Sequence, residues 1–420
     1  MNRFQLVLVG AILVVGVQGV GHTGQLTLAA PEDVGISSER LDRVKQHFER
    51  LIEEERSAGF QLLVSRYGEV VMHEHLGMAD IETRRPISAD SLFHITSMTK
   101  PIVGVAMMML YEEGYYSLQD PVSKYIPEFS DLKVYAGEDD TEAMLLEDPI
   151  REPTIHDLMQ HTAGFSNGRS GDTSVGRMYL EADVLSVDLT QQQFIDRLAT
   201  MPLLYQPGEQ WVYSVATDIQ GYLIEKWTGM ELGAFLKERI FDPLGMDETM
   251  AWVPPDKLAD LATVYTHDEN DSLRAITEVA VGQWGTSEPN RFRGGNQLVS
   301  TSDDYWRFCQ MLLNGGTFDG TRLLSPRSVE MMTQNRLDSP MPLPGLVEQG
   351  FGLNFAVITD RSKMDYPTSA GEYFWGGAAT TIFWIDPTTE LVAIMMTQYL
   401  PGGPEYMDLF HRLVYSTVIQ

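Results

Sequence analysis

Ser97 and Lys100 have the residue types and the spacing that nucleophilic catalysis needs. They are the first and last residues of the tetrad Ser97-Met98-Thr99-Lys100, and on a helix a spacing of three places both side chains on one face. A serine hydroxyl attacks well when a base within about 3 Å takes its proton. A partly desolvated lysine has a lowered pKa and can be that base. The tetrad therefore predicts acyl transfer through Ser97, with Lys100 as the base.

The surroundings of the tetrad matter, because Ser130 and Lys133 have the same spacing in this chain. Ser97 follows the apolar stretch FHIT and opens an apolar helix that we expect over about 97–113. Pro101 lacks an N–H and is tolerated only near a helix start, which places that start close to Ser97. A backbone N–H at a helix start is unpaired and can bind an oxyanion. Ser130 lies instead in a predicted polar loop. On the tetrad alone, Ser97 could still be an ordinary serine at a helix start.

Two further segments add residue types that suit the same chemistry. YQPGEQWVYSVATDIQGYLIEKWTG places Tyr213 just before a predicted helix, and FWGGAATTIFWID places Trp375, Gly376 and Gly377 where a strand is predicted to begin. In this order and at this separation, the three segments resemble the active-site motifs of the penicillin-recognising serine hydrolases. Within that group the chain is most similar to the β-lactamase-like carboxylesterases of family VIII. Other stretches resemble the same family and extend the likeness over most of residues 32–415, namely PTIHDLMQHTAGF, PLGMDETM, GGNQLVSTSDDYWRF and LNGGTFDGTRLLSP.

The resemblance implies a role for each of three side chains. Ser97 would be the acylated nucleophile, Lys100 its hydrogen-bonded base, and Tyr213 the partner that shuttles the proton. A phenol beside an ammonium can hold a lowered pKa, so Lys100 and Tyr213 could pass one proton between nucleophile and leaving group. A tyrosine before a helix can also serve only to cap or to pack, and position is what favours the catalytic role here.

The third segment would complete the site from its backbone. The resemblance implies that the backbone N–H groups of Ser97 and Ala378 form the oxyanion hole. Gly376 and Gly377 would let the substrate approach the strand edge closely, since neither has a side chain. Trp375 would line the pocket, although a large aromatic residue on a sheet often only packs.

Two positions depart from the β-lactamase pattern. Where that pattern usually has Asn in the second motif and Lys or His in the third, this chain has Val215 and Trp375. Both changes remove polar groups that hold a charged lactam and leave a more apolar cleft. We therefore expect a serine carboxylesterase that acts on short-chain esters. A β-lactamase, a D-amino-acid peptidase or amidase of the same fold, and a penicillin-binding acyl trap without turnover are the alternatives.

Two other sites compete for the chemistry. The segment GFSNG, with Ser166 at its centre, fits the G-x-S-x-G elbow of α/β-hydrolases. That elbow must join a strand to a helix, but TIHDLMQH before it predicts a helix. His73 and His75 share one face of a predicted strand and could bind a metal ion, as could His156 and His161. Neither pair has a third ligand in view, so we expect no metal and no cofactor.

Hydrophobic periodicity predicts an α/β protein. Apolar residues three or four apart predict an amphipathic helix from Ser37 to Ala58, ended by Gly59. FQLLVSR and VVMHEHLG flank a glycine turn and predict a β-hairpin. FGLNFAVI, TTIFWID and LVAIMMTQ predict three strands, followed by a helix over about 404–418.

The order of these elements predicts how the chain is divided. Strands at both ends and helices between them indicate one discontinuous α/β domain over 31–120 and 290–420. A mainly helical inserted domain would occupy 121–289. With the resemblance, the expected fold is β-lactamase/transpeptidase-like, with a central antiparallel sheet flanked by helices.

Composition limits the partners. The 420 residues include 30 basic and 59 acidic ones, for a net charge of −29, and such a surface repels phosphate backbones and anionic lipids. Nucleic acid is therefore not an expected partner, whereas a small-molecule ester is. An acidic surface also serves solubility. Cys309 is the only cysteine, so the chain forms no internal disulfide, and its apolar neighbours are typical of a buried structural thiol.

The first 30 residues have the pattern of a targeting segment. Asn2 and Arg3 precede a mostly apolar stretch over 4–20, which predicts a signal peptide or, less favoured by its length, an N-terminal anchor. We expect an exported bacterial protein, periplasmic or secreted, because export without disulfides suits that setting. No other stable membrane association is expected.

Overall fold

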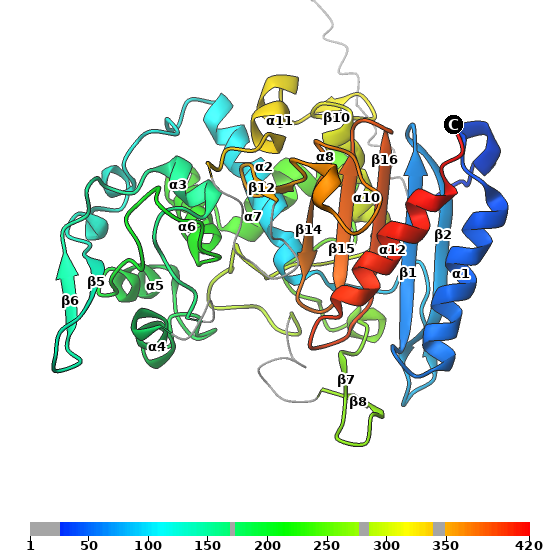
Figure 1. Ribbon diagram of the computed structural model, residues 1–420, viewed down its shortest axis with the longest axis horizontal. Coiled ribbons are helices and arrows are strands. Elements are labelled where there is room, and N and C mark those ends of the chain that lie inside the picture. The colour runs from blue at the N-terminus through cyan, green and yellow to red at the C-terminus, as the bar shows by residue number, and fades with distance from the viewer. Residues whose placement is uncertain (1–25, 169–172, 277–284, 339–348) are drawn as a thin grey trace, which may run out of the picture.

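The computed structural model describes residues 26–168, 173–276, 285–338 and 349–420. Its centre is an eight-stranded sheet in which every neighbouring pair of strands is antiparallel. The order is β12 (Gly350–Phe351), β13 (Ala356–Val357), β14 (Tyr373–Gly377), β15 (Thr381–Asp386), β16 (Leu391–Met396), β1 (Gly59–Arg66), β2 (Glu69–Asp80) and β3 (Arg85–Pro86). The predicted antiparallel sheet is confirmed (Figure 1).

Strands from the two ends of the chain meet in the middle of this sheet. β1 pairs with β16, where Leu63 lies opposite Ile394, and every residue of β1, β15 and β16 is buried. The predicted hairpin joins β1 to β2 through Tyr67 and Gly68, whose φ angles are +56° and +81°. Positive φ at both turn residues matches the right-handed twist of the strands. The sheet is thus assembled from segments far apart in the sequence, with the C-terminal strands beside the N-terminal ones.

Helices cover both faces of the sheet. On one face, α1 (Ser38–Glu53) and α12 (Pro404–Thr417) lie side by side (Figure 1). Phe48 of α1 packs edge-on against Phe60 of β1 at 4.8 Å and against Phe410 of α12 at 5.6 Å between ring centroids. On the other face lies α10 (Ser302–Leu313), whose Trp306 indole N–H donates to Ser65 Oγ of β1 over 2.8 Å. The sheet is therefore flanked by helices, as predicted.

The helix after the tetrad, α2 (Thr99–Glu112), runs through the interior. All of its residues from Thr99 to Leu110 are buried, so its sequence is apolar around the whole circumference rather than on one stripe. It packs against α6 (Ala216–Thr228) and α7 (Leu232–Leu236). The predicted helix over 97–113 is thus present, but it starts with a 3-10 turn, η2 (Thr96–Met98), before the α-helix begins.

The middle of the chain carries most of the remaining helices. Residues 155–244 hold α3 (Ile155–Gln160), α4 (Ser174–Glu181), α5 (Gln191–Leu198), α6, α7, the π-helical turn η5 (Lys237–Phe241) and α8 (Asp242–Leu244). Two hairpins also lie in the middle of the chain, β5 (Val134–Glu138) with β6 (Met144–Glu147), and β7 (Tyr265–His267) with β8 (Leu273–Ala275). Short elements complete the described chain, namely η1 (Pro31–Val34), η3 (Val122–Lys124), η4 (Pro127–Phe129), η6 (Leu258–Asp260), η7 (Arg361–Lys363), β4 (Phe93–His94), β9 (Val299–Ser300), β10 (Thr317–Phe318), β11 (Thr321–Arg322) and α11 (Pro326–Thr333).

The division of the chain at 120 and 290 stays a prediction. Residues late in the expected insertion contact the sheet region directly: Leu261 bridges with Leu92, and Tyr265 bridges with Tyr399. These contacts connect the segment around β7 to residues that border β4 and β16.

Several element boundaries differ from those expected. The first helix ends at Glu53 rather than at Ala58. FGLNFAVI forms two short strands instead of one, because Asn354 takes a φ of +65° between β12 and β13. Among the described residues, no helix has the length and apolar character that a membrane crossing requires. The predicted signal peptide falls almost entirely within residues 1–25, which lie outside the described residues.

Candidate active site

The side chains of Ser97, Lys100 and Tyr213 meet at one point. The Tyr213 hydroxyl donates to Ser97 Oγ over 2.7 Å. The Lys100 ammonium donates to the same oxygen over 3.4 Å and lies 4.5 Å from the centre of the Tyr213 ring. The structure thus brings together all three of the side chains expected to move the proton, from segments more than a hundred residues apart. This arrangement can take a proton from the serine hydroxyl and return it to a leaving group.

The 3-10 turn that carries Ser97 is held by contacts from distant elements. The Tyr305 hydroxyl of α10 donates to the Met98 carbonyl oxygen over 2.9 Å. The Leu298 N–H donates to Thr99 Oγ1 over 3.1 Å, and the Leu298 carbonyl accepts from the Ile95 N–H. These bonds fix the backbone on both sides of the nucleophile, so the hydroxyl is oriented before any substrate arrives.

Lys100 is positioned by a backbone carbonyl that the sequence analysis did not identify. Its ammonium, which is buried, donates to the Gly295 carbonyl oxygen over 2.6 Å. A Cβ on Gly295 would lie 2.8 Å from Asp218 Oδ2 and 3.4 Å from Lys100 Nζ, and one on Gly294 would lie 2.4 Å from the Thr217 carbonyl oxygen. Position 294 therefore requires glycine, and position 295 leaves little room for a side chain, because the segment passes close over the start of α6 to reach the lysine. The segment GGNQLVSTSDDYWRF indicated family likeness but no such role.

Tyr213 belongs to an aromatic cluster that also escaped the sequence analysis. Its ring is stacked on Trp211 with centroids 6.0 Å apart, and it contacts Trp375 at 5.6 Å and His161 at 5.3 Å. Phe351 of β12 closes the cluster by packing on Trp375 at 5.5 Å. Rings on several sides fix the position of the phenol oxygen. Trp375, predicted to line the pocket, therefore lies directly beside the tyrosine.

His161 is a buried neighbour of this site and is electrically neutral. Its Nδ1 lies 3.1 Å from Ser214 Oγ. Burial, and then the nearby Lys100 charge, lower the pKa of His161 well below 6.5. A neutral imidazole lies beside the site.

Within the described part of the chain, no group of three or more His, Cys, Asp or Glu side chains could hold a metal ion.

The third predicted motif lies on β14 beside the nucleophile. Gly377 has no room for a side chain, since a Cβ there would lie 2.2 Å from Thr381 Oγ1 and 2.5 Å from the Ile95 carbonyl oxygen. A Cβ on Gly376 would meet its nearest neighbour at 3.2 Å. The Ala378 N–H, expected to be an oxyanion donor, donates to Thr96 Oγ1 over 2.7 Å. No group of the described residues accepts the Ser97 N–H.

The competing serines lie in unsuitable places. Ser166 follows α3 through a loop rather than a strand, so it does not form the elbow of an α/β-hydrolase. It is buried, and its Oγ accepts the Gly168 N–H over 3.0 Å. Ser130 is exposed, and Lys133 pairs with Asp148 over 2.5 Å at the surface. Ser166 therefore has a local structural partner, and the lysine that follows Ser130 is paired with a carboxylate instead.

Cys309 is a structural residue, as the sequence predicts. Its side chain is completely buried within α10, and burial raises the pKa of the thiol well above 9. A thiol that stays protonated is a poor nucleophile. Cys309 therefore takes no part in the chemistry of this site.

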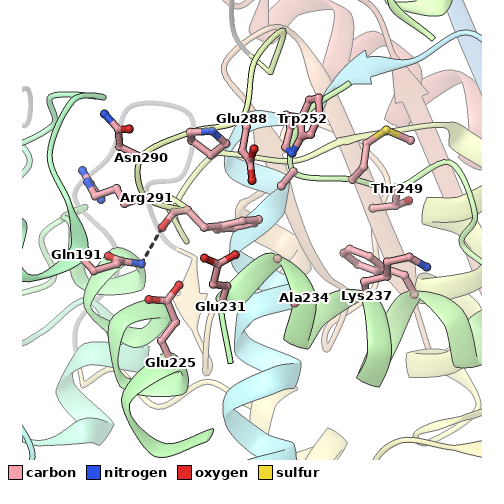
Figure 2. A pocket seen from close by; sticks show the side chains of 16 residues that line it. Gln191, Glu225, Glu231, Ala234, Lys237, Thr249, Trp252, Glu288, Asn290 and Arg291 are labelled. Carbon is pink, nitrogen blue, oxygen red and sulfur yellow. Dashed lines mark hydrogen bonds between the residues drawn. The ribbon is translucent and has the colours of Figure 1, made fainter. Parts of the chain in front are cut away.

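A cavity of about 390 Å³ lies elsewhere, between α7 and the segment 288–292 (Figure 2). Three carboxylates help to line it, those of Glu225, Glu231 and Glu288. The Gln191 amide closes one side by donating to the Phe292 carbonyl oxygen over 3.2 Å (Figure 2). Neither the reactive serine nor its two proton partners are among the residues that line it. This cavity is therefore separate from the site at Ser97.

Comparison with known proteins identifies the family. The family model described as Beta-lactamase matches residues 44–415. The chain belongs to this beta-lactamase family. Proteins that it resembles include protein Rv1367c of Mycobacterium tuberculosis, with 34% identity over 82% of this chain and 86% of that protein. Esterase EstB of Burkholderia gladioli is 30% identical over 87% of this chain and 91% of EstB.

Solved structures share the fold of this chain. EstCE1, described as a hydrolase with promiscuous acyltransferase activity, matches with a TM-score of 0.77 and 23% identity, over 90% of this chain and 98% of EstCE1. The predicted β-lactamase/transpeptidase-like fold is confirmed, and the protein is a serine hydrolase of that fold.

Proposed function

We propose that this protein is a serine carboxylesterase that hydrolyses short-chain esters through an acyl-enzyme at Ser97. The observation that carries the proposal is the Ser97 hydroxyl held by the Tyr213 phenol at 2.7 Å and the Lys100 ammonium at 3.4 Å. A nucleophile with two titratable partners within reach has what covalent acyl transfer requires.

In the first half of the reaction, Ser97 Oγ attacks the ester carbonyl carbon. Its proton passes to the pair formed by Tyr213 and Lys100, which reacts in the form that holds one proton fewer than a phenol beside an ammonium, so that one of the two groups can accept it. The tetrahedral intermediate collapses as the bond to the alkoxy oxygen breaks, and the pair returns the proton to the departing alcohol. In the second half, water gives a proton to the same pair and attacks the acyl-enzyme. The pair then protonates Ser97 Oγ as the carboxylic acid leaves.

The surroundings of the serine favour neutral esters over lactams. Val215, at the position where the β-lactamase pattern has Asn, is buried and offers no polar group. Trp375 stands in place of a cationic residue and packs against Tyr213. An apolar wall that cannot pair with a lactam carboxylate disfavours charged substrates. The name of the relative EstB, an esterase, supports the same choice.

A substrate panel tests this proposal. We would measure turnover of p-nitrophenyl esters of increasing acyl length, of nitrocefin and of a D-alanyl-D-alanine peptide, with the wild type and with Ser97→Ala. The proposal expects sustained release from short-chain esters, lost in Ser97→Ala. Faster turnover of nitrocefin or of the peptide would favour a β-lactamase or a peptidase instead. A single stoichiometric burst on every substrate would identify an acyl trap.

A further inference from the structure

Thr96, the residue before the nucleophile, occupies one of the two backbone donors on which ester hydrolysis depends. Its Oγ1 accepts the Ala378 N–H over 2.7 Å, which is a short distance for an N–H···O bond. The neighbouring donor, the Ser97 N–H, has no acceptor among the described residues. Two backbone N–H groups aimed at one point form an oxyanion hole. Here one of the two is already bonded to a side chain.

The Thr96 hydroxyl lies close against β14. The Thr96 side chain is buried, and a Cβ built on Gly377 would lie only 2.6 Å from Thr96 Oγ1. The hydroxyl is therefore wedged between the turn that carries Ser97 and the strand β14. A substrate oxygen that accepts the Ala378 N–H has to stand where the hydroxyl now stands.

The backbone of Thr96 is unusual in the same place. Its φ is +43°, in the left-handed region that favours glycine and that a β-branched residue rarely adopts. Strained residues of this kind persist where the surrounding structure holds them, and they concentrate at active sites. A glycine would fit this backbone without strain, so the side chain of Thr96 is held here against its own conformational preference.

We propose that Thr96 closes the oxyanion hole of the resting enzyme and opens it by rotating its side chain when substrate binds. This inference rests on the proposed acyl-enzyme at Ser97. A rotation about the Cα–Cβ bond that turns the Cβ hydrogen toward Ala378, rather than the methyl group, moves the hydroxyl away and leaves the N–H free. The substrate carbonyl oxygen then takes the place of Thr96 Oγ1 and receives both donors. Thr96 is thus a positioning residue, which acts through the Ala378 N–H and lowers the rate of acylation by competing for it.

Three variants separate the hydroxyl from the shape of the side chain. Thr96→Ala removes the competing acceptor and should raise the acylation rate constant for p-nitrophenyl butyrate by about three- to tenfold, the equivalent of one lost hydrogen bond. Thr96→Ser keeps the hydroxyl and should stay within about twofold of the wild type. Thr96→Val keeps the branched shape but places a methyl group against the N–H, so acylation should be slower than in the wild type.

Two readouts distinguish this role from a structural one. The carbonyl stretching band of the acyl-enzyme shifts to lower wavenumber as donors bind the oxygen, and the shifted fraction should be larger in Thr96→Ala. An alkyl boronic acid, which places an oxygen in the same hole, should bind more tightly to Thr96→Ala than to the wild type. Loss of stability alone would change neither quantity in that direction.

The experiments give different results if the proposed function is wrong and if only the role of Thr96 is wrong. If the wild type forms no acyl-enzyme, the proposed function fails and this inference fails with it. If the wild type acylates but Thr96→Ala, folded to the same melting temperature, acylates no faster, only the role of Thr96 is overturned. Should Thr96→Ala not fold, the structure of wild-type enzyme phosphonylated on Ser97 decides the matter. The inference expects the phosphonyl oxygen on the Ala378 N–H, and a retained bond to Thr96 Oγ1 would refute it.

Discussion

Replacing Tyr213 by phenylalanine removes one oxygen atom and tests the role of the phenol in proton transfer. Without that oxygen, the Lys100 ammonium at 3.4 Å is the one remaining partner of Ser97 Oγ among the residues that the structure describes, and 3.4 Å lies beyond the usual 2.7–3.2 Å for such a bond. General acid–base catalysis contributes about 10²- to 10⁴-fold. We therefore expect the acylation rate of Tyr213→Phe to fall by about 10²-fold or more. The ring remains in place against Trp211 and Trp375, so the loss of stability should stay near 1 kcal/mol, typical of one hydrogen bond.

The assay is a stopped-flow burst with a short-chain p-nitrophenyl ester, which separates acylation from deacylation. Deacylation should slow as well, because the same pair activates the water. Tyr222→Phe is the matched control. The Tyr222 hydroxyl of α6 donates to Gln192 Oε1 of α5 over 3.0 Å and not to Ser97, so the rates of this variant should equal those of the wild type. Acylation by Tyr213→Phe within about threefold of the wild type, with the control unchanged, would refute the assignment, since it is far from the 10²-fold loss expected.

Three further results follow from the geometry. Gly377→Ala should abolish most activity and lower the melting temperature, because its Cβ would lie 2.2 Å from the nearest atom. Gly376→Ala should have a much smaller effect on both, because its Cβ would lie 3.2 Å from the nearest atom. Equal losses of activity and stability in the two variants would contradict the close packing of β14. Ser166→Ala should keep ester turnover. Denaturant titration should show a loss of about 1 kcal/mol in the free energy of unfolding, because the bond from the Gly168 N–H is lost. Loss of turnover would indicate that Ser166, rather than Ser97, is the nucleophile. Burial lowers the pKa of His73 and of His94 to about 4, below an unfolded value of about 6.5, so the unfolded chain binds more protons between those two pH values. The free energy of unfolding should therefore decrease as the pH is lowered from about 6.5 to about 4, by up to about 1.4 kcal/mol per pH unit for each histidine, and a flat profile would contradict this.

The reacting side chains could be predicted from sequence because each belongs to a local pattern. Ser97 and Lys100 share a helical spacing, Pro101 marks the helix start, and Tyr213 precedes a helix with a clear apolar face. The structure brings the three side chains together as those patterns and the family resemblance imply.

Contacts made by backbone atoms of distant segments could not be predicted in the same way. The Gly295 carbonyl that binds Lys100 and the Thr96 hydroxyl that occupies the Ala378 N–H depend on how three segments pack, which no spacing reveals. A positive φ at Thr96 is equally invisible, because threonine disfavours that conformation. The sequence contains one sign that this segment approaches Lys100 closely, namely the adjacent glycines Gly294 and Gly295 before an apolar stretch.

Boundaries also depended on information beyond local pattern. The run FGLNFAVI is continuous in hydrophobicity, yet Asn354 turns the chain in its middle, with its side-chain amide bonded to Gln220 of α6 over 2.6 Å. The β5–β6 hairpin was not predicted, because its second strand is largely exposed and lacks the alternation of a half-buried strand. In both cases tertiary contacts, rather than propensity, decide the structure.

The most direct test is to find which residue becomes acylated. The enzyme would be mixed with a p-nitrophenyl ester, quenched in acid during the burst, digested and examined by mass spectrometry. We predict one acyl group per chain, on the peptide that contains Ser97, and none in Ser97→Ala. An acyl group on any other serine, or rapid ester turnover by Ser97→Ala, would contradict the account.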